Sequence, residues 1–258
     1  MDTAFYDELA PFYHLLYPDW AASVERQGAA LDALLRELGV TPGAPVLDAA
    51  CGIGTQTLGL AARGYAVSAS DLSPGAVARL GRELAARGLA GRVTTAVRDL
   101  RTLAGVPDGS QAALLACDNS VPHLLSDAEI LRAFRACRRC LAPGGAAVFS
   151  VRDYAALGRI DPDVRPYGLR RTAEGRFLAV QVWEWDGDCY DLRVYLTEDS
   201  TEGPDGGACR TRVLRSRYYA VAIPRLLELM REAGLVDVQR RDDVLFQPVL
   251  SGRSPAAV

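Results

Sequence analysis

Charged side chains follow several apolar segments of this sequence, at positions where buried strands would end. The segment GGAAVFSVRDY runs from a Gly-Gly turn through four apolar residues to Arg152 and Asp153. A charge buried in the interior is costly unless it is paired. We therefore expect either that the segment has reached water at this point or that Arg152 binds a negatively charged group.

A glycine turn and two acids accompany the first two apolar segments. Asp48 precedes Gly52 and Gly54 in DAACGIGTQT, and Asp71 ends the next segment. The glycines allow a ligand to approach the backbone before a helix begins, and Asp71 is placed to accept hydrogen bonds from a ribose diol. A dinucleotide site would have a third glycine where Thr57 stands, and Asp48 would repel a pyrophosphate. S-adenosylmethionine has no phosphate and carries an ammonium group, so it fits these residues better.

Predicted strands alternate with predicted helices in the first part of the chain. This alternation indicates parallel β-α-β units and a doubly wound sheet. In such sheets ligands bind beyond the carboxyl ends of the strands, where Asp48, Asp71, Asp99 and Arg152 stand. The predicted strands cover residues 44–50, 65–71, 93–100, 111–118 and 144–151, and the predicted helices cover residues 23–38, 55–63, 73–88 and 127–141.

The alternation ends near residue 154, and antiparallel strands are expected after it. Residues 176–199 predict a hairpin around Asp186-Gly187-Asp188, and residues 210–222 predict a third strand. The polar loop 198–208 is the predicted mobile tip of this insertion. The closing elements are a predicted helix at 223–234 and predicted strands at 235–242 and 245–252.

The predicted fold is α/β, a doubly wound, mostly parallel seven-stranded sheet with an antiparallel insertion after strand five. The insertion separates the fifth strand from the last helix of the same sheet. The predicted segments are an N-terminal helical lid (1–40), a cofactor-binding core (41–153), the antiparallel substrate or lid insertion (154–220), and a C-terminal helix with the closing strands (221–258).

The composition excludes several classes of function. All 29 basic residues among the 258 are arginine, so a Schiff-base lysine or a Walker-type lysine is excluded. A net charge of -3 gives no basic excess for nucleic acid, and no apolar run is long enough to span a membrane. The acidic N-terminus does not resemble a signal peptide, and the six cysteines are expected to be reduced thiols in the cytoplasm. Cys137 and Cys140 lie in an amphipathic helix without a second pair, so no metal site is predicted.

The motifs VLDAACGIGTQT, VSASD and RDL together resemble the class I S-adenosylmethionine-dependent methyltransferases, which have a Rossmann-like fold. Within that superfamily the chain resembles the glycine N-methyltransferase group over about residues 5 to 154. That group has alanine at the position of Ala50 and an arginine that opens a helix at the position of Arg26. Its N-S-x-x-H-L motif matches Asn119, Ser120, His123 and Leu124, and its R-N-Y motif matches Arg152-Asp153-Tyr154 with one departure.

The resemblance implies a site for S-adenosylmethionine. Arg26 would hold the carboxylate of the cofactor, Asp99 would lie near the adenine amino group, and the backbone N–H of Leu100 would donate to the ring. The implied cofactor-binding residues are Tyr13, Arg26, Asp48, Ala50, Gly52, Gly54, Asp71, Leu72, Asp99, Leu100 and Cys117.

The resemblance also implies an acceptor site. Tyr6 and Tyr13 would close over the methyl group, although the aromatic N-terminal segment also fits a helix packed on the sheet edge. Arg152 would grip a carboxylate of the acceptor, with Asn119 as a second contact. His123 is either a general base or a residue that caps the following helix. The implied catalytic residues are Tyr6, Tyr13, Asn119, His123 and Arg152.

The expected activity is N-methylation of a small, amino-acid-like amine that carries a carboxylate. The alternatives are an O- or C-methyltransferase of a natural-product intermediate and a non-catalytic module that binds S-adenosylmethionine or a dinucleotide. In the first alternative, the aromatic residues of the insertion would form an apolar lid. The expected partner is a small-molecule acceptor, without nucleic acid or membrane, and homo-oligomerisation stays open. The expected location is the cytoplasm.

Overall fold

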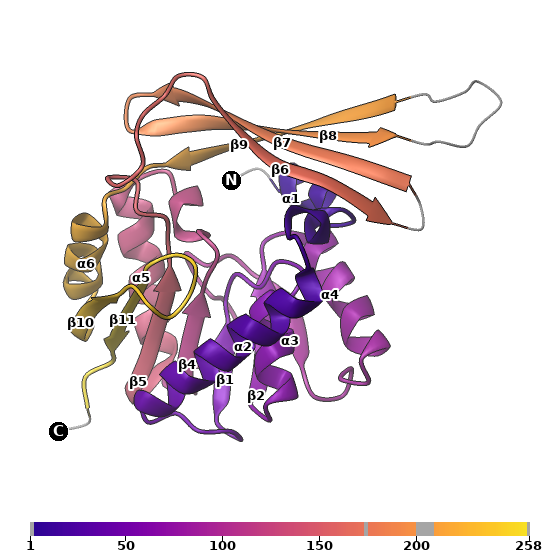
Figure 1. The fold of residues 1–258 in the computed structure, drawn as a ribbon. Coiled ribbons are helices and arrows are strands. Elements are labelled where there is room, and N and C mark those ends of the chain that lie inside the picture. The colour runs from indigo at the N-terminus through magenta and orange to yellow at the C-terminus, as the bar shows by residue number, and fades with distance from the viewer. Residues whose placement is uncertain (1–2, 173–174, 200–208, 257–258) are drawn as a thin grey trace.

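Two β-sheets organise the chain in the computed structural model, which describes residues 3–172, 175–199 and 209–256. Most of the loop predicted as a mobile tip, residues 200–208, lies outside the described residues. The first sheet has seven strands and the second has four (Figure 1).

The central sheet has the strand order β10-β11-β5-β4-β1-β2-β3. Its strands run parallel except for β11, which is antiparallel to both of its neighbours. The predicted doubly wound, mostly parallel seven-stranded sheet is therefore confirmed. The strands are β1 (Pro45–Asp48), β2 (Ala66–Asp71), β3 (Thr94–Val97), β4 (Gln111–Ala116), β5 (Leu141–Ser150), β10 (Val236–Arg241) and β11 (Val249–Arg253).

Helices cover both faces of this sheet, because neighbouring strand residues point to opposite sides. Val46 and Val148 pack with the helices of one face, and Leu47 and Phe149 pack with those of the other. The first face carries α2, α3 and α4, and the second carries α5 and α6. The helices, with the 3-10 helices marked η, are α1 (Ala4–Leu9), η1 (Tyr13–Leu16), α2 (Trp20–Glu37), α3 (Thr55–Ala62), α4 (Pro74–Ala86), η2 (Val121–His123), α5 (Asp127–Cys140) and α6 (Ile223–Glu232).

The chain reverses its direction of winding between β1 and β4, which are neighbours in the sheet. Asp48 on β1 lies in register with Leu115 on β4. The residues that follow these two strands therefore meet at the same edge, where ligands of open α/β sheets bind.

The second sheet is antiparallel and has the order β6-β7-β8-β9, one strand more than the sequence predicted. The additional strand is β6. Its sequence did not predict a strand, because it contains Pro166 and Gly168, and proline and glycine are unfavourable inside strands. The register of β6 against β7 shifts between these two residues, and an edge strand tolerates such an irregularity. The four strands are β6 (Asp163–Thr172), β7 (Gly175–Asp186), β8 (Cys189–Asp199) and β9 (Cys209–Tyr219).

The second sheet lies above the carboxyl ends of the central strands, and α1 lies beneath it (Figure 1). Phe5 and Leu9 of α1 pack into one buried cluster with Trp183, Tyr190 and Leu214 of the second sheet. The second sheet and the N-terminal segment therefore cover the ligand-binding edge of the central sheet from above.

Candidate functional site

A first cavity lies at the carboxyl ends of the central strands, and the space within it is about 840 Å³ when the part open to solvent is included. Tyr6 and His123, two of the predicted catalytic residues, line it together with many of the predicted cofactor-binding residues. The predicted cofactor-binding residues on its wall are Tyr13, Ala50, Gly52, Asp71, Leu72, Asp99, Leu100 and Cys117.

The turn between β1 and α3 is held against the end of β2 by Asp71. Its Oδ2 accepts from the N–H of Gly52 at 2.9 Å, and its Oδ1 accepts from the N–H of Ser73 at 2.9 Å. Gly54 does not line the cavity. It begins α3 with φ +97°, and a Cβ there would lie 2.3 Å from a methyl carbon of Leu80. Asp71 presents a carboxylate to the cavity, and burial raises its pKa.

Asp48 lies beneath this cavity and is fully buried. Its Oδ2 accepts from the hydroxyl of Thr57 at 2.7 Å, and its Oδ1 has no hydrogen-bond partner among the described residues. Burial raises the pKa of Asp48 to about 7. The backbone N–H of Ala50, in the glycine turn, also faces this carboxyl group and opposes the rise in its pKa.

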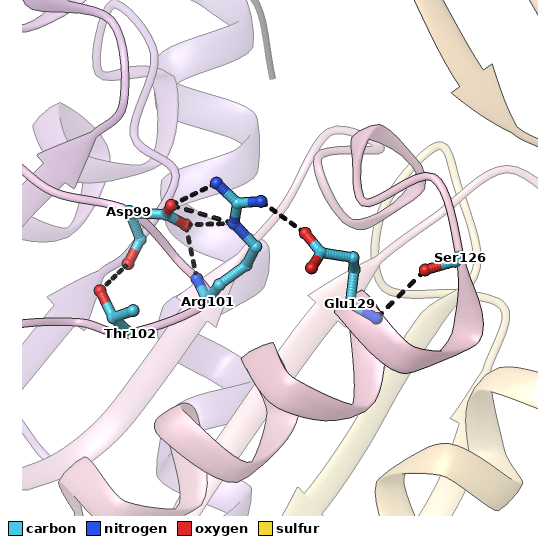
Figure 2. A network of polar contacts seen from close by, with 5 residues as sticks. All are labelled: Asp99, Arg101, Thr102, Ser126 and Glu129. Carbon is cyan, nitrogen blue, oxygen red and sulfur yellow. Dashed lines mark hydrogen bonds and ion pairs between the residues drawn. The ribbon is translucent and has the colours of Figure 1, made fainter.

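Asp99 belongs to a charged network that reaches α5 (Figure 2). Nε and Nη2 of Arg101 donate to its Oδ2 at 2.9 and 2.6 Å, and the Arg101 backbone N–H donates to Oδ1 at 2.8 Å. These bonds lower the pKa of Asp99. Nη1 of Arg101 also pairs with Glu129 at 2.5 Å, and the Glu129 N–H meets Ser126 Oγ at 3.3 Å. The strand-three carboxylate is therefore ionised and fixed in place.

Tyr6 and His123 form a hydrogen-bonded pair in the wall of the first cavity. The Tyr6 hydroxyl lies 2.6 Å from Nε2 of His123 and 3.3 Å from the hydroxyl of Tyr218, and Ser216 Oγ lies 3.4 Å from Nδ1. Burial, followed by the nearby Arg152, lowers the pKa of His123 to about 3. Burial also raises the pKa of Tyr6. At neutral pH a neutral phenol therefore faces a neutral imidazole.

A second cavity, with a space of about 1160 Å³ when the part open to solvent is included, adjoins the first and is lined by Arg152 and Arg26. Arg26 lies on the exposed side of α2, with Nη2 donating to Ser23 Oγ at 2.9 Å. Arg26 thus lines the second cavity and not the first, and Tyr13 is the one predicted cofactor-binding residue of the first cavity that lines the second as well. Tyr13 and Asp118 line both cavities.

The half-buried Arg152 has no carboxylate partner among the described residues. Its guanidinium lies 5.1 Å from the ring centroid of Trp183, and Nη1 donates to the hydroxyl of Tyr190 at 3.4 Å. Asn119 holds the backbone in place, since its Oδ1 accepts from the Arg152 N–H at 2.9 Å and its Nδ2 donates to Tyr154 at 2.8 Å. Asn119 therefore positions the backbone of Arg152, and the cation forms no ion pair among the described residues, although its charge acts on Asp118, which lines the same cavity.

Asp118 is a site residue that the sequence analysis did not select. Its Oδ2 accepts from the Tyr17 hydroxyl at 2.8 Å and from Gln56 Nε2 at 3.1 Å. Its Oδ1 is buried and has no partner among the described residues. The sequence carried a sign of this role, because Asp118 stands two residues beyond the end of β4, at the point where the winding reverses.

Two negative findings concern the described residues. They contain no group of three or more His, Cys, Asp and Glu that could hold a metal ion, and Cys137 and Cys140 are buried in α5. No helix in the described part of the chain has the length and apolar character needed to cross a membrane.

Comparison with known proteins finds a methyltransferase domain in this chain. Residues 46–145 match the family model described as a methyltransferase domain. The chain is 27% identical over 158 residues to "Putative methyltransferase YqeM" of Bacillus subtilis. That match covers 61% of this chain and 57% of YqeM, so the chain spans little more than half the length of this relative.

Solved structures of methyltransferases share the whole fold. The CcbJ methyltransferase of Streptomyces caelestis superposes with a TM-score of 0.77 at 20% identity, over 100% of both chains. CalS10 of Micromonospora echinaspora, an amino pentose methyltransferase with S-adenosylmethionine bound, superposes with a TM-score of 0.74 at 19% identity, over 94% of both chains. Residues 46–145 thus form a methyltransferase domain, in a chain that has the fold of the S-adenosylmethionine-dependent methyltransferases.

Proposed function

We propose that the protein is an S-adenosylmethionine-dependent methyltransferase that methylates a nitrogen of a small molecule carrying a carboxylate. The fold, the methyltransferase domain and the first cavity support the cofactor. The unpaired cation of Arg152 in the adjoining cavity supports the carboxylate. The described residues fit the cofactor, because Asp71, which can accept from a diol, stands beside the glycine turn in the cavity wall, and the acidic Asp48 is buried behind that turn.

The residues of the first cavity have distinct roles in this proposal. Asp71 accepts from a ribose diol while its own backbone donors hold the Gly52 turn in place. Asp99 and the Leu100 N–H contact the adenine. Asp48 lies behind the turn and attracts the ammonium of the methionine part. Arg26, on the second cavity, binds the cofactor carboxylate only if that part of the cofactor extends across the junction.

The bound cofactor supplies a methyl group that is already activated on a sulfonium. The protein therefore has to align the acceptor with that methyl group and exclude water from the site. Good alignment in the near-attack geometry lowers a barrier by about 7 to 11 kcal/mol. Tyr6 and Tyr13 shield the first cavity from the N-terminal side. Aromatic faces attract a sulfonium cation while they exclude water.

The single observation that carries the acceptor assignment is the state of Arg152. A guanidinium half withdrawn from water is costly without a close countercharge, and no described carboxylate forms an ion pair with it, although its charge acts on Asp118 in the same cavity. Its planar fork matches a carboxylate in two parallel hydrogen bonds, which would orient a small acceptor firmly. Trp183 and Tyr190 contact the guanidinium of Arg152, which lines the second cavity.

Substitution of Arg152 tests this assignment. Arg152→Ala is expected to raise the KM of a carboxylate-bearing amine by the equivalent of about 2 to 5 kcal/mol, and Arg152→Lys is expected to be harmful too. The affinity for S-adenosylhomocysteine should barely change. Arg165→Ala is the matched control, because Arg165 also stacks on Trp183, at 3.9 Å, but is paired with Asp163 at 2.7 Å.

Esterification of the acceptor gives the complementary test. The methyl ester should lose as much with the wild-type protein as the free acid loses with Arg152→Ala, and the two losses should not add. If a neutral amine, such as an amino sugar without an acid group, is methylated as fast as the acid, Arg152 is not the anchor.

A further inference from the structure

Asp118 stands where the methyl donor and the acceptor must meet. Tyr13 and Asp118 are the residues that line both the first cavity and the second. The cofactor occupies the first cavity in the proposed function, and Arg152 anchors the acceptor in the second. The reacting nitrogen therefore has to reach the junction between them.

The carboxylate of Asp118 has room for another hydrogen-bond donor. Tyr17 and Gln56 both donate to Oδ2, at 2.8 and 3.1 Å, whereas the buried Oδ1 has no partner among the described residues. A carboxylate accepts up to about four hydrogen bonds, and a buried oxygen left without one is unfavourable. A donor-bearing cation would satisfy it.

The backbone at this position is also unusual. Asp118 and Asn119 both have positive φ, 56° and 66°, a conformation that non-glycine residues adopt rarely. Hydrogen bonds from the two N–H groups to Ser150 Oγ and Ser150 O, at 2.8 and 2.9 Å, hold it. Strained residues of this kind cluster at functional sites.

From this geometry we infer that Asp118 binds the ammonium group of the acceptor and takes its proton before methyl transfer. The inference rests on the proposed function and extends it. Asp118 and Arg152 would then hold the two ends of a zwitterion, which makes an amino acid the fitting acceptor class.

The proton transfer balances as follows. An N–H bond of the acceptor ammonium breaks and an O–H bond forms on Asp118, which leaves a neutral amine with a free electron pair. That pair forms the bond to the methyl carbon as the carbon–sulfur bond breaks. The proton then leaves Asp118 for solvent, which returns the carboxylate to its starting state.

The surroundings of Asp118 suit a proton acceptor. Burial raises its pKa, while the hydrogen bonds from Tyr17 and Gln56 and the charge of Arg152 oppose that rise. The other titratable groups near it are Tyr13, Asp48 and Cys117. His123 is less suited, since Tyr6 occupies its Nε2 and Ser216 faces its Nδ1.

Asp118→Asn tests the inference, because asparagine keeps the shape and tolerates positive φ. Transfer of methyl groups to a panel of L-amino acids is measured between about pH 5 and about pH 10, with Asp32→Asn on α2, away from both cavities, as the control. We expect kcat/KM of Asp118→Asn to fall by about 10² to 10⁴ at neutral pH. The deficit should shrink about tenfold per pH unit as solution supplies neutral amine.

Three other results of these measurements would contradict the inference about Asp118. Parallel pH profiles for the variant and the wild type would overturn the inference while the proposed function stands. A matching loss of S-adenosylhomocysteine affinity in calorimetry would assign Asp118 to the cofactor and also overturn it. If the wild type methylates no amine, both fail together.

Tyr17→Phe covers the case in which Asp118→Asn does not fold. The hydrogen bond from Tyr17 lowers the pKa of Asp118, so its loss should move the acid limb of kcat/KM to higher pH. An unmoved limb would contradict the inference.

Discussion

At the scale of single residues, burial determines the charge of His123. Its ring is buried between Tyr6, Tyr218 and Ser216, and its pKa is lowered to about 3. In the unfolded chain a histidine titrates near 6.5. Below that pH, His123 is protonated in the unfolded chain but stays neutral in the folded protein. This residue therefore makes folding less favourable as the pH falls.

The first residue-scale prediction follows from that difference. The free energy of unfolding of the wild type minus that of His123→Asn should fall by about 2 kcal/mol between pH 7 and pH 5. Urea denaturation at the two pH values measures it. The packing energy that the variant loses is the same at both pH values, so it does not affect the change of this difference with pH. Asp48, whose raised pKa has the opposite effect, is present in both proteins. A constant difference would mean that His123 is charged in the folded state.

At the scale of elements, the position of α1 depends on its approach to the start of α4. Asp7 Oδ1 accepts from the N–H of Gly75 at 2.8 Å and from Ser73 Oγ at 2.5 Å. A Cβ on Gly75 would lie 2.9 Å from the Cα of Asp7, a contact that only a shift of the backbone relieves. Since α1 carries Tyr6, this contact also shapes the first cavity.

Two glycine substitutions in α4 make this contact testable. Gly75→Ala should displace α1, raise hydrogen exchange in residues 3–18 and lower methyl transfer. Gly81→Ala is the matched control, because nothing lies within 4 Å of its Cβ position, and it should stabilise the helix by about 0.5 to 1 kcal/mol. Equal exchange of residues 3–18 in the two variants would show that α1 does not depend on the close approach.

At the scale of the whole molecule, segments that are far apart in the sequence together form the first cavity. The N-terminal segment and the ends of the central strands all contribute to its wall. A ligand that binds the folded state alone therefore stabilises the entire assembly. The lining residues favour an adenosine-containing ligand without phosphates over a dinucleotide.

Ligand-dependent melting provides the corresponding prediction. S-adenosylhomocysteine at about 100 times its Kd should stabilise the protein by about 2.7 kcal/mol, which for a chain of this size raises Tm by about 5 to 10 °C. NAD at the same concentration should leave Tm unchanged. A shift with NAD and none with S-adenosylhomocysteine would contradict the assignment of the β1–α3 turn.

The sequence by itself determined the elements of the central sheet and the acids at their ends. The spacing of apolar residues and the presence of turn residues are local features of a sequence. The strands that lead to Asp48 and Asp71 could therefore be predicted from their own residues. The strand β6 could not be predicted in this way, because Pro166 and Gly168 are not typical of a strand, and β6 is recognised only from its pairing with β7, whose register shifts between these two residues.

The tertiary structure alone decided how the site is divided. It placed Arg26 on the second cavity and left Arg152 without an ion pair among the described residues. It also joined Tyr17 to Asp118, residues 101 positions apart in the chain. Such contacts arise from the order of the strands and the packing of the N-terminal segment beneath the second sheet. No local pattern encodes them, because each partner's own neighbours in the sequence are compatible with many other arrangements.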